Sequence, residues 1–138
     1  MDEKRIARYV SKIQLIEERI EDIRSWEDDF TTDKRSRLAV YKAMQEIVEA
    51  SMDVLAMRLK DSEKLPMDDY TNIDRAYKSG IIDERIKYAL EEANGLRNRL
   101  VHGYNGINET VALESMKSLF PLFEAYIERM RQWLKELI

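Results

Sequence analysis

Apolar residues recur at every third or fourth position along most of this chain, which is the spacing of a helix with one buried face. The pattern is most regular in residues 2 to about 26, where the opposite face is charged. Its stripe consists of Ile6, Tyr9, Ile13, Ile16, Ile20 and Ile23. A stripe of this kind is typical of packing inside a helical bundle, and it would also suit an interface between subunits.

A second helix is predicted from the capping sequence Thr-Thr-Asp at residues 31–33 to about residue 59. Residues 60 to 69 are expected to form a connection, because Pro66 and several charges interrupt the helical pattern. A short helix then follows from about Asp68 and ends near Gly80, since glycine often terminates helices.

Two further helices are predicted, one before residues 95–104 and one after them. The first starts at Asp83, and its inner face consists of Ile86, Ala89, Leu90, Ala93 and Leu96. The last helix starts by Val111 and ends near Leu137. Pro121 lies inside its apolar pattern and is expected to kink or split it, because proline lacks the N–H and crowds the preceding turn.

No segment shows the alternating pattern of a β-strand, so the expected fold is all-α. It should be an up-and-down bundle of four long helices with one extra short helix. The length indicates a single helical domain over residues 1–138. The first and last helices carry more apolar surface than a lone bundle of this size needs, so we expect a homodimer.

Composition then narrows the classes of function. The chain has no cysteine, which excludes disulfides, thiol nucleophiles and zinc–thiolate sites. Its net charge of -4 argues against nucleic-acid binding by the whole surface, but a local basic site is compatible with it. It has no apolar run of the roughly 20 residues that a membrane span needs, and its charged first residues are unlike a signal peptide. We therefore expect a cytoplasmic protein without membrane contact.

The residues best suited to catalysis or to binding a ligand lie close together at positions 95–104, Gly-Leu-Arg-Asn-Arg-Leu-Val-His-Gly-Tyr. His102, the one histidine of the chain, can move a proton near neutral pH, and Arg97 can hold a phosphate through its planar guanidinium. Such a set would suit metal-free cleavage of RNA, in which the 2′-hydroxyl attacks its own phosphate. From this chemistry alone, a surface or helix-capping histidine is the more common explanation.

Helical geometry limits what one copy of this stretch can do. Asn98 and His102 are four positions apart and share a face. Arg97 and His102 are separated by about 140° on an ideal helix. They would converge best if the backbone bends near Gly103, or if a second subunit supplies the missing side.

A metal centre is not expected. His102 has no second histidine and no nearby Asp/Glu cluster with the spacing of metal ligands, and no cofactor site is apparent. The tyrosines beside the apolar stripes are expected in the core and not in a base-stacking surface; they are Tyr9, Tyr41 and Tyr88.

The stretch resembles a known motif. Arg97-Asn98-Arg99-Leu100-Val101-His102 has the arginine, polar residue and histidine spacing of the HEPN superfamily, and Tyr104 extends it to the Arg-x4-His-x-Tyr of the HepT-type toxins. The similarity extends over the chain, including its length and its long first and last helices. It implies a small helical bundle that forms homodimers and cleaves RNA without a metal, with the motifs of two subunits facing each other across a cleft.

The resemblance also implies a role for each motif residue. Arg97 would bind and stabilise phosphate, His102 would transfer the proton, and Asn98 would orient them. Arg99 falls in a variable position of the motif and would give electrostatic support only. Tyr104 matches the tyrosine that a minimal nucleotidyltransferase antitoxin of the MntA type modifies with AMP, which blocks the toxin.

Two other hypotheses remain open on the sequence. The chain could be a non-catalytic HEPN module that binds a nucleotide or RNA and serves as the partner of a minimal nucleotidyltransferase. It could also be a structural helical protein without a site, which the motif makes the least favoured. Growth arrest on expression of this chain alone, relieved by a neighbouring nucleotidyltransferase gene, would favour the toxin.

Overall fold

The computed structural model describes residues 1–103 and 107–138, and the described part is built from helices without strands. The helices are α1 (Glu3–Trp26), α2 (Lys34–Asp61), α3 (Asp69–Lys78), α4 (Glu84–Val101) and α5 (Glu109–Leu137), with one 3-10 turn, η1 (Glu27–Asp29), after α1. The predicted all-α fold with four long helices and one short helix is therefore confirmed.

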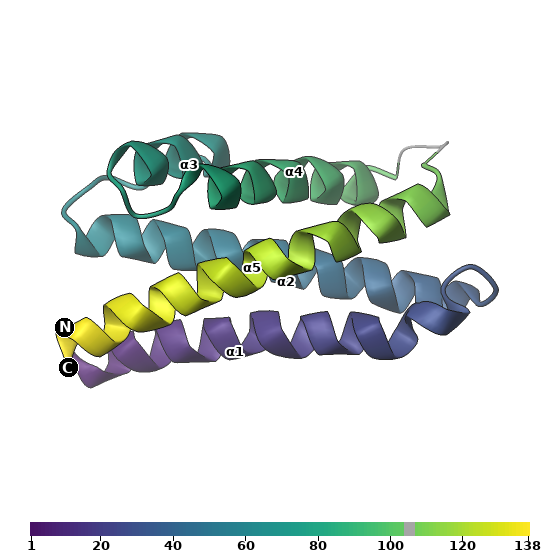
Figure 1. Cartoon of the computed structure of the whole chain (residues 1–138), viewed down its shortest axis with the longest axis horizontal. Helices are drawn as coiled ribbons and strands as arrows, with labels where there is room; N and C mark the ends of the chain where they lie inside the picture. The colour runs from purple at the N-terminus through teal and green to yellow at the C-terminus, as the bar shows by residue number, and fades with distance from the viewer. Residues whose placement is uncertain (104–106) are drawn as a thin grey trace.

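The long helices lie roughly side by side, and α3 and α4 form one edge of the bundle (Figure 1). The helix α1 packs along α2, whereas α4 packs against both α2 and α5. The short helix α3 contacts α2 and α4, so it lies beside the helix that carries the motif. The two chain termini lie at the same end of the bundle (Figure 1).

Every one of these five helices begins with a capping side chain. In each case a carboxylate or amide oxygen accepts a hydrogen bond from a backbone N–H of the first turn, which would otherwise lack a partner. The capping residues are Asp2, Asp33, Asp68, Asp83 and Asn108. These local signals fix where the helices start, and the predicted starts of α2 and α4 at Asp33 and Asp83 are confirmed.

The buried apolar residues form one continuous cluster between the helices. The predicted stripe of α1 supplies five of its members, Tyr9, Ile13, Ile16, Ile20 and Ile23. Tyr126 of α5 is also buried, and its hydroxyl donates to the carbonyl of Ser51 at 2.8 Å. None of the helices in the described residues is long and apolar enough to cross a membrane.

The structure corrects the prediction for Tyr88 and narrows the one for Pro121. Tyr88 is 58% exposed, because the inner face of α4 passes through Ala89 and Leu90, and Tyr88 lies on the outer side. Of the two outcomes predicted at Pro121, a kink or a split, the split does not occur, because Pro121 lies inside one continuous helix. Pro121 is exposed, so its ring projects away from the core and the packing on the opposite side holds the helix together.

A polar cluster joins the start of α1 to the end of α2. The Tyr9 hydroxyl donates to the Asp61 carboxylate at 2.5 Å, and Arg5 Nε donates to the same oxygen at 3.1 Å. Beside them, the Arg58 guanidinium lies over the Trp133 ring at 4.0 Å from its centre, and this ring meets Tyr9 edge-on. We refer to Arg5, Tyr9 and Asp61 as the terminal cluster.

Candidate functional site

The motif residues occupy the last two turns of α4 and the position that follows it. Arg97, Asn98 and Arg99 are helical, and α4 ends at Val101. His102 is the C-cap, and its backbone N–H donates to the Asn98 carbonyl at 3.1 Å. Gly103 then takes a φ of 61°, a left-handed conformation that glycine adopts without strain. The sequence therefore stops the helix directly after the motif histidine.

Arg97 is held by three neighbouring side chains. Its Nη2 donates to Asn94 Oδ1 at 3.0 Å and to Asn98 Oδ1 at 3.1 Å, and it forms an ion pair with Asp69 Oδ2 at 3.3 Å. Its Nε donates to Asn98 Oδ1 at 3.3 Å. The structure therefore brings Arg97 and Asn98, two of the predicted site residues, into hydrogen-bond contact. We call Asp69, Asn94, Arg97 and Asn98 the motif cluster.

Sequence reasoning missed Asn94 and Asp69. Asn94 is fully buried, and its Nδ2 donates to the Leu90 carbonyl at 2.9 Å. Asp69 is the first residue of α3, so its contact with Arg97 joins two helices. A polar Asn among the apolar inner positions of α4 could have drawn attention to Asn94, because a buried amide must be hydrogen-bonded. No local pattern identifies Asp69, whose role depends on where α3 packs.

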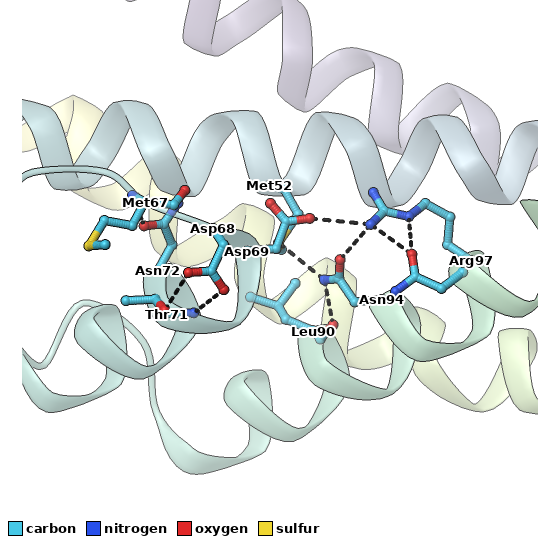
Figure 2. A network of polar contacts seen from close by, with 10 residues as sticks. Met52, Met67, Asp68, Asp69, Thr71, Asn72, Leu90, Asn94 and Arg97 are labelled. Carbon is cyan, nitrogen blue, oxygen red and sulfur yellow. Dashed lines mark hydrogen bonds and ion pairs between the residues drawn. The ribbon is translucent and has the colours of Figure 1, made fainter.

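The start of α3 is itself held in place by hydrogen bonds (Figure 2). Asn72 donates to the Met67 carbonyl at 3.0 Å and accepts from the Met67 N–H at 2.7 Å. Asp68 accepts from the N–H and the hydroxyl of Thr71, and these bonds lower the pKa of the Asp68 carboxyl. Asp69 therefore projects from a fixed helix end toward Arg97, as Figure 2 shows.

The guanidinium of Arg97 is held on one side only. All of its hydrogen bonds in the described part of the chain involve Nε and Nη2, and Nη1 makes none. Among the described residues, no buried side-chain nitrogen or oxygen lacks a partner, so Nη1 must be in contact with solvent. The side chain as a whole is 17% exposed. The arrangement leaves one donor edge available to an anion such as a phosphate.

His102 does not join the motif cluster within one chain. The partners of the Arg97 side chain are Asp69, Asn94 and Asn98, and His102 is exposed at the helix end. Arg99 is also exposed, and its side chain lies beside Gly95. Tyr104 lies outside the described residues.

The last turns of α4 combine these basic groups with the negative end of the helix dipole, which favours cations there. Two arginines and the histidine thus lie within six residues of a chain whose net charge is -4. In residues 1–103 and 107–138, no group of three or more His, Cys, Asp or Glu side chains is arranged to hold a metal ion.

Comparison with known proteins shows which family the chain belongs to. The family model described as "Ribonuclease HepT-like" matches residues 11–130. An Archaeoglobus fulgidus protein named "Putative RNase" is 33% identical over 130 residues, covering 94% of this chain and 96% of that protein. The tRNA nuclease HepT of Aphanizomenon flos-aquae is 22% identical over 134 residues, covering 90% of this chain and 88% of that protein.

The fold has a solved counterpart as well. The tri-AMPylated HEPN toxin of Shewanella oneidensis, solved in complex with its MNT antitoxin, superimposes with a TM-score of 0.85 at 20% identity. The match covers 96% of this chain and 99% of the toxin. The helical architecture and the match to the family model, which includes the whole of α4, lead to the same assignment: the chain belongs to the HepT-like ribonuclease family.

Proposed function

We propose that this chain is a metal-independent endoribonuclease toxin of a type II toxin–antitoxin pair, acting on RNA in the cytoplasm. The observation that carries the proposal is the guanidinium of Arg97, which is held by three acceptors and leaves Nη1 accessible, five positions before the exposed His102. Membership of the HepT-like ribonuclease family supports this function.

The proposed reaction needs only groups that the motif contains. The 2′-hydroxyl oxygen of a ribose attacks the adjacent phosphorus while His102 accepts its proton. The bond from phosphorus to the 5′-oxygen breaks, and that oxygen leaves with a proton from a second His102 or from water. The products are a 2′,3′-cyclic phosphate and a 5′-hydroxyl. Arg97 stabilises the negative charge that accumulates on the phosphoryl oxygens.

Two subunits are part of the proposal. Within one chain the Arg97 side chain has Asp69, Asn94 and Asn98 as its partners, and His102 lies beyond the end of α4. A homodimer in which two motifs face each other would place the histidine of one subunit near the arginine of the other. Pairing would also double the local positive charge, with Arg99 contributing to it.

The proposed regulation acts on Tyr104. A nucleotidyltransferase antitoxin of the MntA type would transfer AMP from ATP to the phenolic oxygen, which forms a bond to the α-phosphorus as pyrophosphate leaves and the phenol proton passes to solvent. The HEPN toxin of similar fold was solved in a tri-AMPylated form with an MNT antitoxin, which supports such a partner here. An added AMP two residues from His102 would obstruct the cleft.

The first prediction concerns cleavage. His102→Ala and Arg97→Ala are expected to lower RNA cleavage by at least about 100-fold, since each removes a group that acts in the transition state. Both variants should keep the helical circular dichroism and the oligomeric state of the wild-type protein. Cleavage is measured on labelled RNA with a chelator present, because the proposed reaction uses no metal. Arg35→Ala is the matched control, as this arginine is exposed on α2.

The proposal is wrong if purified His102→Ala protein cuts RNA as fast as the wild-type protein. A wild-type protein that binds a nucleotide or RNA but does not cut it would instead support the non-catalytic partner of a nucleotidyltransferase. Cleavage that a chelator abolishes would contradict the metal-independent mechanism alone.

The second prediction concerns Tyr104. Intact mass is measured after expression with and without the neighbouring nucleotidyltransferase gene. Co-expression should add whole AMP units to the wild-type chain and none to Tyr104→Phe. Mass gains that persist in Tyr104→Phe would move the modification to another residue, and no gain in the wild-type chain would contradict the proposed antitoxin.

A further inference from the structure

We propose that Asn94 and Asp69 are positioning residues for Arg97, which clamp one side of its guanidinium so that the other side is presented to the phosphate of the RNA. This inference rests on the proposed function for its substrate. The clamp itself is a matter of geometry and can be tested separately from cleavage.

Asn94 supplies the rigid half of the clamp. Its side chain is fully buried, and both of its Nδ2 contacts lie inside the bundle: the Leu90 carbonyl at 2.9 Å and the Met52 sulfur at 3.2 Å. These contacts fix the amide so that its oxygen faces Arg97 Nη2 (Figure 2). A reversed amide would place its own N–H groups against the guanidinium, which has only donors. The core therefore dictates where this acceptor lies.

Asp69 supplies the second half from another helix. Its carboxylate reaches Arg97 Nη2 at 3.3 Å and is 35% exposed. Its backbone is set by the capped first turn of α3 and by the paired hydrogen bonds between Asn72 and Met67. Arg97 thus contacts two independently fixed elements, and its long side chain loses the freedom that an exposed arginine would keep.

The acceptors lie on the Nε and Nη2 side of the guanidinium, and this leaves the Nη1 edge for a ligand. A guanidinium that is already oriented gives up less entropy when it binds a phosphate. It also keeps its position as charge develops in the reaction. Asp69 and Asn94 would act through Arg97 and would not touch the RNA themselves.

The test compares four variants. Asp69→Ala removes the acceptor, and Asp69→Asn keeps an oxygen but removes the charge. Asn94→Ala removes the buried half of the clamp. Asp74→Ala is the matched control, because Asp74 is another α3 carboxylate that forms an ion pair with α4, through Lys87, without contacting Arg97.

Cleavage is followed by kcat and KM on a labelled RNA, with unfolding measured in parallel. Asp69→Ala should lower kcat/KM by about 10- to 100-fold, because a misdirected group costs this much. Asp69→Asn should recover activity to within a few-fold of wild type, and Asp74→Ala should match wild type in kcat and KM. A purely structural role would instead lower the stability of Asp69→Ala and Asp74→Ala alike and leave kcat/KM of the folded protein unchanged.

A second measurement does not depend on cleavage. The Arg97 Nε–H signal is identified in NMR spectra by its loss in Arg97→Lys, and its exchange with water is measured without RNA. Exchange should be about tenfold faster in Asp69→Ala and Asn94→Ala, because a guanidinium that loses an acceptor of Nη2 turns more freely and breaks the hydrogen bond from Nε to Asn98 more often. It should be unchanged in Asp74→Ala.

Two results would overturn the inference. One is an Nε–H that exchanges at the same rate in all of these variants, since Asp69 and Asn94 would then not hold Arg97. The other is Asp69→Ala protein that cuts RNA as fast as wild type or faster, since Asp69 would then compete with phosphate. If wild-type protein does not cut RNA at all, the proposed function fails, while the exchange rates still decide whether the clamp exists.

Discussion

The terminal cluster and the motif cluster use the same kinds of groups in opposite arrangements. In the terminal cluster one carboxylate is the centre, and the Asp61 oxygen accepts from both Arg5 and Tyr9. In the motif cluster one cation is the centre, and Arg97 donates to three side chains. Both clusters join two helices by an arginine and an aspartate.

The difference is in how much depends on a single acceptor. Tyr9 is fully buried and its hydroxyl donates to Asp61, while Arg5 also reaches the Met57 carbonyl. Arg97 has three side-chain acceptors, and its Nη1, like that of Arg5, makes no hydrogen bond among the described residues. Loss of Asp61 would leave a buried hydroxyl without its acceptor, whereas loss of Asp69 would leave Arg97 with two. The contribution of an ion pair to stability therefore depends on what else holds its partners.

The largest effect that separates the two clusters should be on stability. Asp61→Ala leaves the buried Tyr9 hydroxyl and the Arg5 guanidinium without their acceptor, and it should lower the free energy of unfolding by about 2 kcal/mol. Asp69→Ala removes a partly exposed ion pair and should lower it by less than about 1 kcal/mol. Urea unfolding followed by the fluorescence of Trp26 and Trp133 measures both values.

The rate of RNA cleavage should show the reverse order in the same two variants. Folded Asp61→Ala should cleave RNA at close to the wild-type rate, whereas Asp69→Ala should cleave it more slowly. Equal losses of stability, or equal losses of cleavage, would mean that the two clusters do not differ in role. Asp61→Asn keeps an oxygen acceptor and should recover part of the lost stability.

Much of the fold could be predicted from the sequence because the information is local. The stripe of α1 repeats at helical spacing. An aspartate whose side chain can accept from the free backbone N–H groups of the next turn marks the start of a helix, as at Asp33 and Asp83. The position of Tyr88 could not be read in this way. It stands one residue from the buried Ala89, and which side of α4 is covered depends on how α2 and α5 pack against it.

The candidate site divides in the same manner. Arg97 and Asn98 are neighbours in the sequence, so the pair could be found there, and the structure adds that their side chains are hydrogen-bonded. The contact of Arg97 with Asp69 joins residues 28 positions apart and exists only because α3 folds back beside α4. Such a partner carries no signal in spacing or composition. Sequence reasoning therefore found the proposed catalytic groups and Asn98, and it missed Asn94 and Asp69, which also hold Arg97.

A smaller effect should appear at alkaline pH and belongs to the terminal cluster. Burial raises the pKa of Tyr9 above its ordinary value, and the hydrogen bond to Asp61 raises it further. The folded protein thus keeps Tyr9 neutral while the unfolded chain releases this proton above about pH 10. Its contribution to stability is complete below pH 10 and is lost as pH rises, by up to about 1.4 kcal/mol per pH unit.

Tyr9→Phe should therefore cost about 1 kcal/mol at pH 7, where one hydrogen bond is lost, and should make the alkaline decline of stability shallower. The decline will not vanish, because burial also raises the pKa of Tyr126. Unfolding free energies measured from pH 7 to pH 11 test this, with Tyr88→Phe as the control for losing a hydroxyl from an exposed ring. If the stability of Tyr9→Phe falls with pH as steeply as that of the wild-type protein, the Tyr9 proton does not cause the alkaline decline. The contrast with the motif cluster would then rest on Arg5 and Asp61 alone.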